Sequence, residues 1–261
     1  MVLEKTWEEH VDFLTKMIKL KLFYLWNYCK DHPDDKFQYA IREKVDIFQL
    51  TSFNNNSITS NIRDFDSSEK WIRKEKAIQE AYIAYKDDCA AFEEIGHRLL
   101  EESIEQRPDS DLTDMSFLDG YQCGSLKYDN YDPIRKSVCI HFANALQPFS
   151  PFEDSDYLKT CLLDLIQQCE EKYNAKFLEM TSWLNSYQKW LNFFPESWLE
   201  NRSEGRNDIN WTYGFWGQFI TARRTFNTAL GLYYRENKKL KYPLRHSFCY
   251  IKDLKEHLKN I

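Results

Sequence analysis

The stretch KSVCIHFAN at Lys136–Asn144, with the loop QPFSPF at Gln147–Phe152, decides how this chain folds. Residues 137–142 are largely apolar and partly β-branched, which predicts a strand over 136–144. The two prolines of the loop fix their own φ angles and stiffen the end of that strand. A helical pattern over 156–173 and a strand pattern over 176–182 come next. We therefore expect two parallel neighbouring strands joined by a crossover helix.

The segments on either side predict further helices and strands. Thr6 and Glu9 form a capping box at the start of a helical pattern over 6–30. Residues 67–106 contain no proline and predict either one long helix or two helices with a break near Gly96. The other predicted helices cover 36–48, 185–194, 213–236 and 253–258, and the other predicted strands cover 121–128 and 245–251.

These elements predict an α+β fold, namely a helix-rich single domain with a small mixed sheet of about three to four strands in its C-terminal half. No internal repeat and no linker divides the sequence, so we expect residues 1–261 to form one domain. Within it, a helical N-terminal half, about 1–110, precedes a mixed α/β half, about 111–261.

Composition and charge exclude several classes of protein. The net charge of −6 disfavours a nucleic-acid binder, which usually carries a basic excess. The apolar run over 20–28 is short and adjoins several lysines, so no membrane span is expected. The seven cysteines form no C-x-x-C pair and favour reduced thiols in a cytoplasmic protein. Basic residues gather over 235–259, either as a solvated tail or as a patch for an anionic ligand.

Polar side chains gather where the two central predicted strands end. The first strand and its loop supply His141, Asn144 and Ser150, and the end of the second supplies Ser182 and Asn185. Ligands favour the edge of a sheet where parallel strands end. We expect His141 to act as general acid or base, and the four other side chains to bind substrate. The alternative is a buried histidine beside side chains that cap turns.

A second group of candidate substrate-binding residues lies in the helical pattern over 213–236. Gln218 and Arg223 are expected to bind an anionic group, because arginine pairs with carboxylates and phosphates in a bidentate manner. Gly214 and Gly217 permit close approach of a backbone there. The alternative is an aromatic core helix with exposed arginines.

The order strand, helix, strand, helix over about 136–194 resembles the core of GNAT-type acyltransferases. This resemblance implies transfer of an acyl group from an acyl-CoA held between two splayed strands. That family carries a glycine-rich pyrophosphate loop before its crossover helix. In this chain the corresponding residues are Pro148-Phe149-Ser150-Pro151-Phe152.

The predicted function is that of an enzyme, a transferase, acting on a small polar or anionic metabolite by group transfer of the acyl type. Neither a cofactor nor an oligomeric state is assigned, and Rossmann, P-loop and zincin motifs do not occur in the sequence. One alternative is a helical-bundle oxidase or oxygenase of the di-iron type, because Glu94 and His97 share one helix face. Another is a non-enzymatic protein-interaction module that uses the aromatic stretch 183–198.

Overall fold

The computed structural model describes residues 5–60 and 62–261 and divides the chain into two compact units. The helical unit comprises the chain up to Phe117 together with Ile209–Lys238, and the sheet unit comprises Leu118–Asp208 with Lys239–Ile261. The α+β prediction is confirmed, because many helices accompany a four-stranded mixed sheet in the C-terminal half. That residues 1–261 make one domain stays a prediction.

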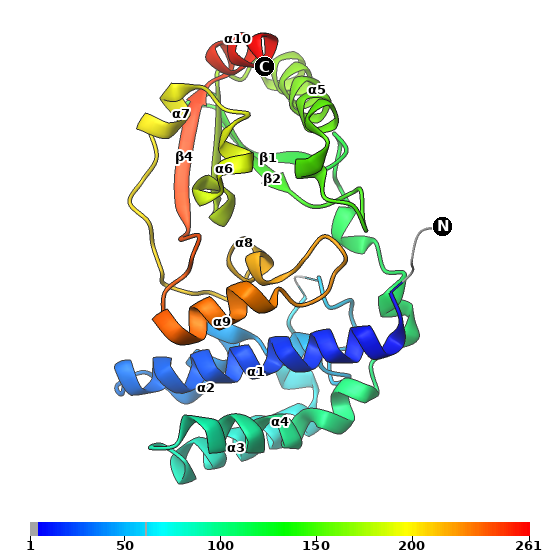
Figure 1. Cartoon of the computed structure of the whole chain (residues 1–261), viewed down its shortest axis with the longest axis vertical. Coiled ribbons are helices and arrows are strands. Elements are labelled where there is room, and N and C mark those ends of the chain that lie inside the picture. Colours follow the sequence, from blue (N-terminus) through cyan, green and yellow to red (C-terminus); the bar gives the residue numbers. More distant parts are fainter. Residues whose placement is uncertain (1–4, 61) are drawn as a thin grey trace. The chain divides into compact units, whose positions relative to one another are not determined.

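The helical unit is built on three long helices, α1 (Trp7–Asp31), α3 (Glu69–Ala84) and α4 (Cys89–Glu105). α4 packs against both α1 and α3, as Figure 1 shows. The predicted capping box of Thr6 and Glu9 is present at the start of α1. The expected break near Gly96 is wrong, because the chain breaks between Ala84 and Cys89 instead. Gly96 lies inside α4, where a Cβ atom would come within 3.0 Å of the Leu22 side chain of α1.

Two predicted helices of this unit are shorter than expected. The pattern over 36–48 yields α2 (Phe37–Tyr39), a π-helical turn (Ala40–Val45) and a 3-10 turn (Phe48–Leu50). The pattern over 213–236 yields α8 (Tyr213–Trp216), a 3-10 turn (Gly217–Phe219) and α9 (Thr228–Asn237). A tight turn interrupts the second pattern, because the Thr221 N–H donates to the Thr225 carbonyl and Arg224 takes a positive φ of 59°.

The sheet unit contains strands β1 (Leu126–Asp132), β2 (Ser137–Phe142), β3 (Phe177–Ser182) and β4 (Arg245–Tyr250), in that spatial order. β2 and β3 are parallel, as predicted, and α5 (Ser155–Tyr173) connects them, whereas the two outer pairs are antiparallel. The predicted bounds of the first strand are wrong. The Asp132 carboxylate accepts hydrogen bonds from the Ile134 and Arg135 backbone, which moves the hairpin turn beyond residue 132.

Helices cover one face of this sheet and bury its core. α5 and α10 (Ile251–Asn260) pack against each other on that face, and α7 (Glu196–Glu200) packs on β4 (Figure 1). Trp190 of α6 (Gln188–Leu191) and Trp198 of α7 are fully buried in this core. The predicted helix over 185–194 is wrong in its bounds, since a 3-10 turn (Trp183–Ser186) precedes the short α6. Over the described ranges, no helix is both long and apolar enough to cross a membrane.

The two parallel strands separate before either of them ends. β2 and β3 pair at three positions, Ser137 with Phe177, Val138 with Leu178 and Cys139 with Glu179. β2 then continues to Phe142 and β3 continues to Ser182 without pairing to each other. Each strand keeps its outer partner, since β1 pairs with β2 up to Phe142 and β4 pairs with β3 up to Ser182. We call the point after Cys139 and Glu179 the split.

Candidate functional site

The face of the sheet opposite α5 carries polar and titratable side chains. Because side chains alternate along a strand, the residues between the buried ones share this second face. We call it the open face, and its central residues are Lys127, Asp129, Cys139, His141, Glu179, Thr181 and His246. Most of these are half-buried, so the face meets both solvent and the sheet.

Three of these side chains form a close cluster beside the split. A ring nitrogen of His141, a carboxylate oxygen of Asp129 and the Cys139 thiol sulfur all lie within 4.8 Å of one another. The Nε2–H of His141 donates to Asp129 Oδ1 at 2.7 Å, because an ionised carboxylate can only accept. When the ring is neutral, this bond leaves the lone pair on Nδ1. The His141 and Asp129 side chains are 38% and 39% exposed, so a solvent-borne molecule can reach them.

The Cys139 thiol is protonated at neutral pH. Burial raises its pKa to about 11, and the negative charges of Asp129 and Glu179 add to this effect. Cys139 therefore does not ionise by itself near pH 7, in contrast to activated catalytic cysteines. A proton acceptor or a metal ion is needed to make it a thiolate.

Glu179 lies next to the cluster on β3 and is bound by its own partners. Its carboxylate accepts from the Ser137 hydroxyl at 2.7 Å and from the Arg135 guanidinium at 3.1 Å. His246 Nε2 lies 3.7 Å from the same carboxylate, and Thr181 bonds the other ring nitrogen. These contacts fix Glu179, and they balance much of its charge.

The side chains predicted to bind substrate at the strand ends form hydrogen bonds with nearby backbone groups. Asn144 bonds Phe149 O and the Leu146 N–H, and the Ser150 hydroxyl accepts from the Phe152 N–H. The Ser182 hydroxyl, 5% exposed, accepts from the Leu184 N–H.

Asn185 is fully buried and ties the ends of two strands together. Its amide donates to Met180 O and to Arg245 O, both at 2.9 Å, and its oxygen accepts from the Trp198 indole. These bonds give Asn185 a structural role at the end of β3, although contact with a substrate stays a prediction.

Gln218 and Arg223 belong to the helical unit, whereas His141 belongs to the sheet unit. Gln218 is 2% exposed and donates to Phe215 O at 3.3 Å. Arg223 is exposed, and its guanidinium lies 3.7 Å from the Glu9 carboxylate. The contacts described for both residues thus lie within their own unit, and their predicted binding of an anionic group stays a prediction.

The alternative metal pair lies on α4. Glu94 is exposed and pairs with Lys19 at 3.3 Å and with Arg98 at 3.6 Å. His97 is 9% exposed, and burial lowers its pKa. Within residues 5–60 and 62–261, the grouping of His, Cys, Asp and Glu close enough to hold a metal ion is Asp129, Cys139 and His141, and it excludes this pair. The strands β2 and β3 also count against an all-helical oxidase.

Two of the three tryptophans in the aromatic stretch 183–198 are buried in the core. Trp190 and Trp198 are both 0% exposed, and Phe194 stacks on Trp198 at 4.1 Å. These rings are core residues of the sheet unit. Trp183 is only half-buried, so the alternative of an interaction module stays a prediction.

The sequence identified His141 but missed Asp129 and Cys139. Asp129 was assigned to the turn after the first strand, whereas it lies within β1 and pairs with Cys139. The spacing Cys-x-His within one strand was the available signal, because side chains two apart share a face.

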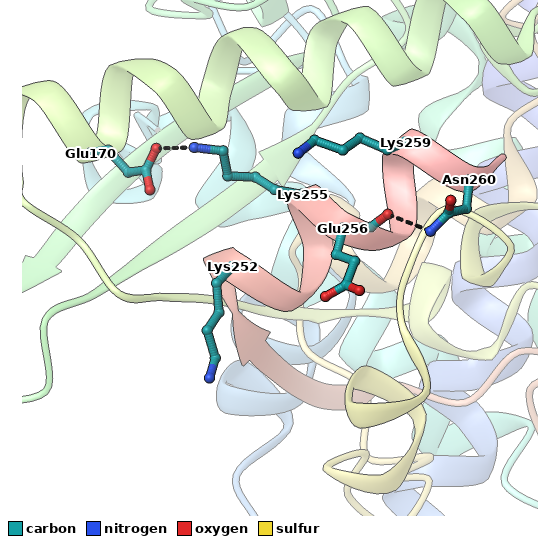
Figure 2. A pocket seen from close by; sticks show the side chains of 6 residues that line it. All are labelled: Glu170, Lys252, Lys255, Glu256, Lys259 and Asn260. Atoms are coloured by element: carbon teal, nitrogen blue, oxygen red, sulfur yellow. Dashed lines mark hydrogen bonds and ion pairs between the residues drawn. The ribbon is translucent and has the colours of Figure 1, made fainter.

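The basic C-terminal segment forms a shallow pocket on α10. Figure 2 shows Lys252, Lys255 and Lys259 on this helix, with Lys255 reaching Glu170 of α5 at 2.8 Å. Glu256 and Asn260 complete the lining. Two carboxylates among these lysines favour a solvated charged surface over a site for an anion.

Comparison of the chain with known protein families, curated proteins and solved structures finds no match. The function must therefore be argued from the open face and the split.

Proposed function

We propose that this chain is an enzyme that transfers an acyl group from a thioester or ester to a small polar acceptor at the split between β2 and β3. One observation supports this above all others. The His141–Asp129 pair is half-exposed on the open face, and His141 lies two residues beyond Cys139, the last residue of β2 that pairs with β3. An extended donor could pair with strand backbone where β2 and β3 no longer pair with each other.

His141 acts as the base, and Asp129 holds its ring. Asp129 keeps the proton on Nε2, so that Nδ1 faces the reaction as an acceptor, which is the role of the carboxylate in a catalytic triad. Nδ1 takes the proton of the acceptor as it attacks the acyl carbonyl. The carbon–sulfur or carbon–oxygen bond of the donor then breaks, and His141 returns the proton to the leaving group.

The test is an acyl-transfer assay with acetyl thioesters and a panel of small amine, alcohol and thiol acceptors. Release of the donor thiol is followed for the native chain and for His141→Gln. We expect the substitution to lower kcat by about 10²–10⁴-fold, the usual contribution of a general base. Binding of a non-reactive thioether analogue, measured by calorimetry, should not change.

The matched control is His257→Gln, which changes a histidine of the same unit that lies on α10 and bonds Asn192 O. It should leave kcat unchanged. The proposal is overturned if the native chain binds no thioether analogue, or if His141→Gln transfers acyl groups at the native rate.

A further inference from the structure

We infer that Asp129, Cys139 and His141 form a binding site for a zinc-type divalent ion on the open face, with one coordination position left for solvent or substrate. This site requires no part of the helical unit, since all three residues lie on the hairpin of β1 and β2. Its binding of metal is independent of the proposed acyl transfer.

The backbone brings the three donors together. Asp129 and Cys139 are direct partners in the antiparallel pairing of β1 and β2, and His141 follows Cys139 by two residues on the same face. Their donor atoms lie within 4.8 Å of one another. Zinc bonds of about 2.0–2.3 Å give a tetrahedron whose edges are roughly 3.5 Å, so small side-chain rotations bring the donors into place.

The chemical types of the three donors determine which metal ion the site prefers. A thiolate, an imidazole and a carboxylate are all ligands of Zn²⁺, whereas Mg²⁺ and Ca²⁺ prefer sites made of oxygen alone. Three protein ligands and an open fourth position are typical of reactive zinc sites rather than structural ones.

The surroundings of the cluster determine how the ion is held. Asp129 has a second oxygen, Oδ2, which lies 3.7 Å from the Lys127 ammonium. Lys127 can therefore hold the carboxylate from the far side while Oδ1 turns from His141 to the metal. Binding replaces the thiol proton, so that one proton is released to solvent as the sulfur–metal bond forms.

Zinc and acyl transfer should exclude each other, and this consequence rests on the proposed function. The ion occupies the Asp129 oxygen and a ring nitrogen that hold and carry the proton in the transfer step. Zinc would thus act as an inhibitor, removable by a chelator, of the same site.

The experiment uses the metal-stripped full chain and Co²⁺, which has the coordination preferences of zinc and absorbs visible light. We expect a single equivalent of Co²⁺ to give a thiolate-to-cobalt charge-transfer band and strong four-coordinate bands, both abolished by Zn²⁺. Cys139→Ser should remove the charge-transfer band. His141→Gln should weaken binding by more than about 100-fold, since loss of even an outer-shell partner costs 10–100-fold.

Two variants serve as controls for adventitious binding. Cys89→Ser changes the other half-buried cysteine, and His257→Gln changes a histidine on α10, so both should bind Co²⁺ as the native chain does. No charge-transfer band in the native chain, or a band that survives Cys139→Ser, overturns the inference. A band without any acyl transfer would keep the metal site and reject the proposed function.

Discussion

Lys21 is a cation buried inside the helical unit. Its side chain is 3% exposed, donates to Val45 O and lies 4.8 Å above the Trp216 ring. Burial lowers its pKa from 10.5 to about 8, although the nearby Asp46 carboxylate opposes the shift. No feature of the sequence pattern marks this lysine, because its position on α1 differs from that of its exposed neighbours only once α1 has packed.

The buried ammonium makes stability depend on pH. Between about pH 8 and 10.5 the unfolded chain keeps the Lys21 proton that the folded chain has lost, so the contribution of Lys21 to the free energy of unfolding rises with pH in this window. We expect this rise to reach about 3 kcal/mol, at 1.36 kcal/mol per pKa unit. Lys21→Met should lack it. Urea unfolding of both proteins at pH 7.5, 9 and 10 checks this, and a difference between them that stays constant over that range would contradict it.

At the scale of elements, helices and strands were predicted best where the sequence carries a strong local signal, such as a capping box or a regular apolar pattern. The capping box set the start of α1, and the apolar patterns located α5, β2, β3 and β4 within a few residues. The failures come from local turns that the apolar pattern does not mark. β1 was displaced because its turn depends on the Asp132 carboxylate, and 213–236 was overextended because a hydrogen-bonded turn at 221–225 interrupts it.

The N-terminus of α5 bears on which acyl donors the proposed transfer would use. Asp154 is its N-cap, and the carboxylate accepts from the Tyr157 N–H. This negative charge occupies the helix end at which a pyrophosphate would otherwise be favoured. We expect acetyl-CoA to have no advantage in kcat/KM over the acetyl thioester of pantetheine, which lacks the nucleotide.

The variant Asp154→Ser keeps the cap and removes the charge. It should lower KM for acetyl-CoA and leave KM for the pantetheine thioester unchanged. Steady-state kinetics with both donors decide the matter. A native preference for acetyl-CoA of more than about tenfold, or 1.4 kcal/mol, would show that another part of the chain binds the nucleotide.

At the scale of the whole molecule, the residues of the candidate site could be predicted only in part. The sequence singled out His141 because a histidine at a strand end is a local signal, and the parallel neighbours β2 and β3 followed from the crossover rule. Asp129 reaches His141 through a strand pairing that the sequence misplaced. Gln218 and Arg223 belong to a segment, Ile209–Lys238, that returns to the helical unit. The amino-acid composition shows no change at the points where the chain passes from one unit to the other.

The net charge of −6 predicts how the whole chain interacts with nucleic acids. Lys252, Lys255 and Lys259 form a basic group on α10, and Glu170 and Glu256 lie among them. We expect no binding of duplex DNA or single-stranded RNA at 150 mM salt, because few phosphates could be neutralised. Fluorescence anisotropy with labelled oligonucleotides checks this, with Lys255→Glu as a comparison. Micromolar binding that weakens in Lys255→Glu would contradict it.

The position of β4 in the sequence affects how the protein is made. β3 pairs with β4 at six positions but with β2 at only three. Most of the backbone hydrogen bonds of β3 therefore cannot form until β4 has been synthesised. Roughly 60 residues separate Ser182 from Arg245, which a ribosome adding about 5–20 residues per second takes some 3–12 s to synthesise. During those seconds a nascent chain exposes an unpaired strand edge, the feature on which wrong pairing between chains begins. Slower translation of this segment would lengthen that exposure, and a chaperone that shields strand edges would shorten it.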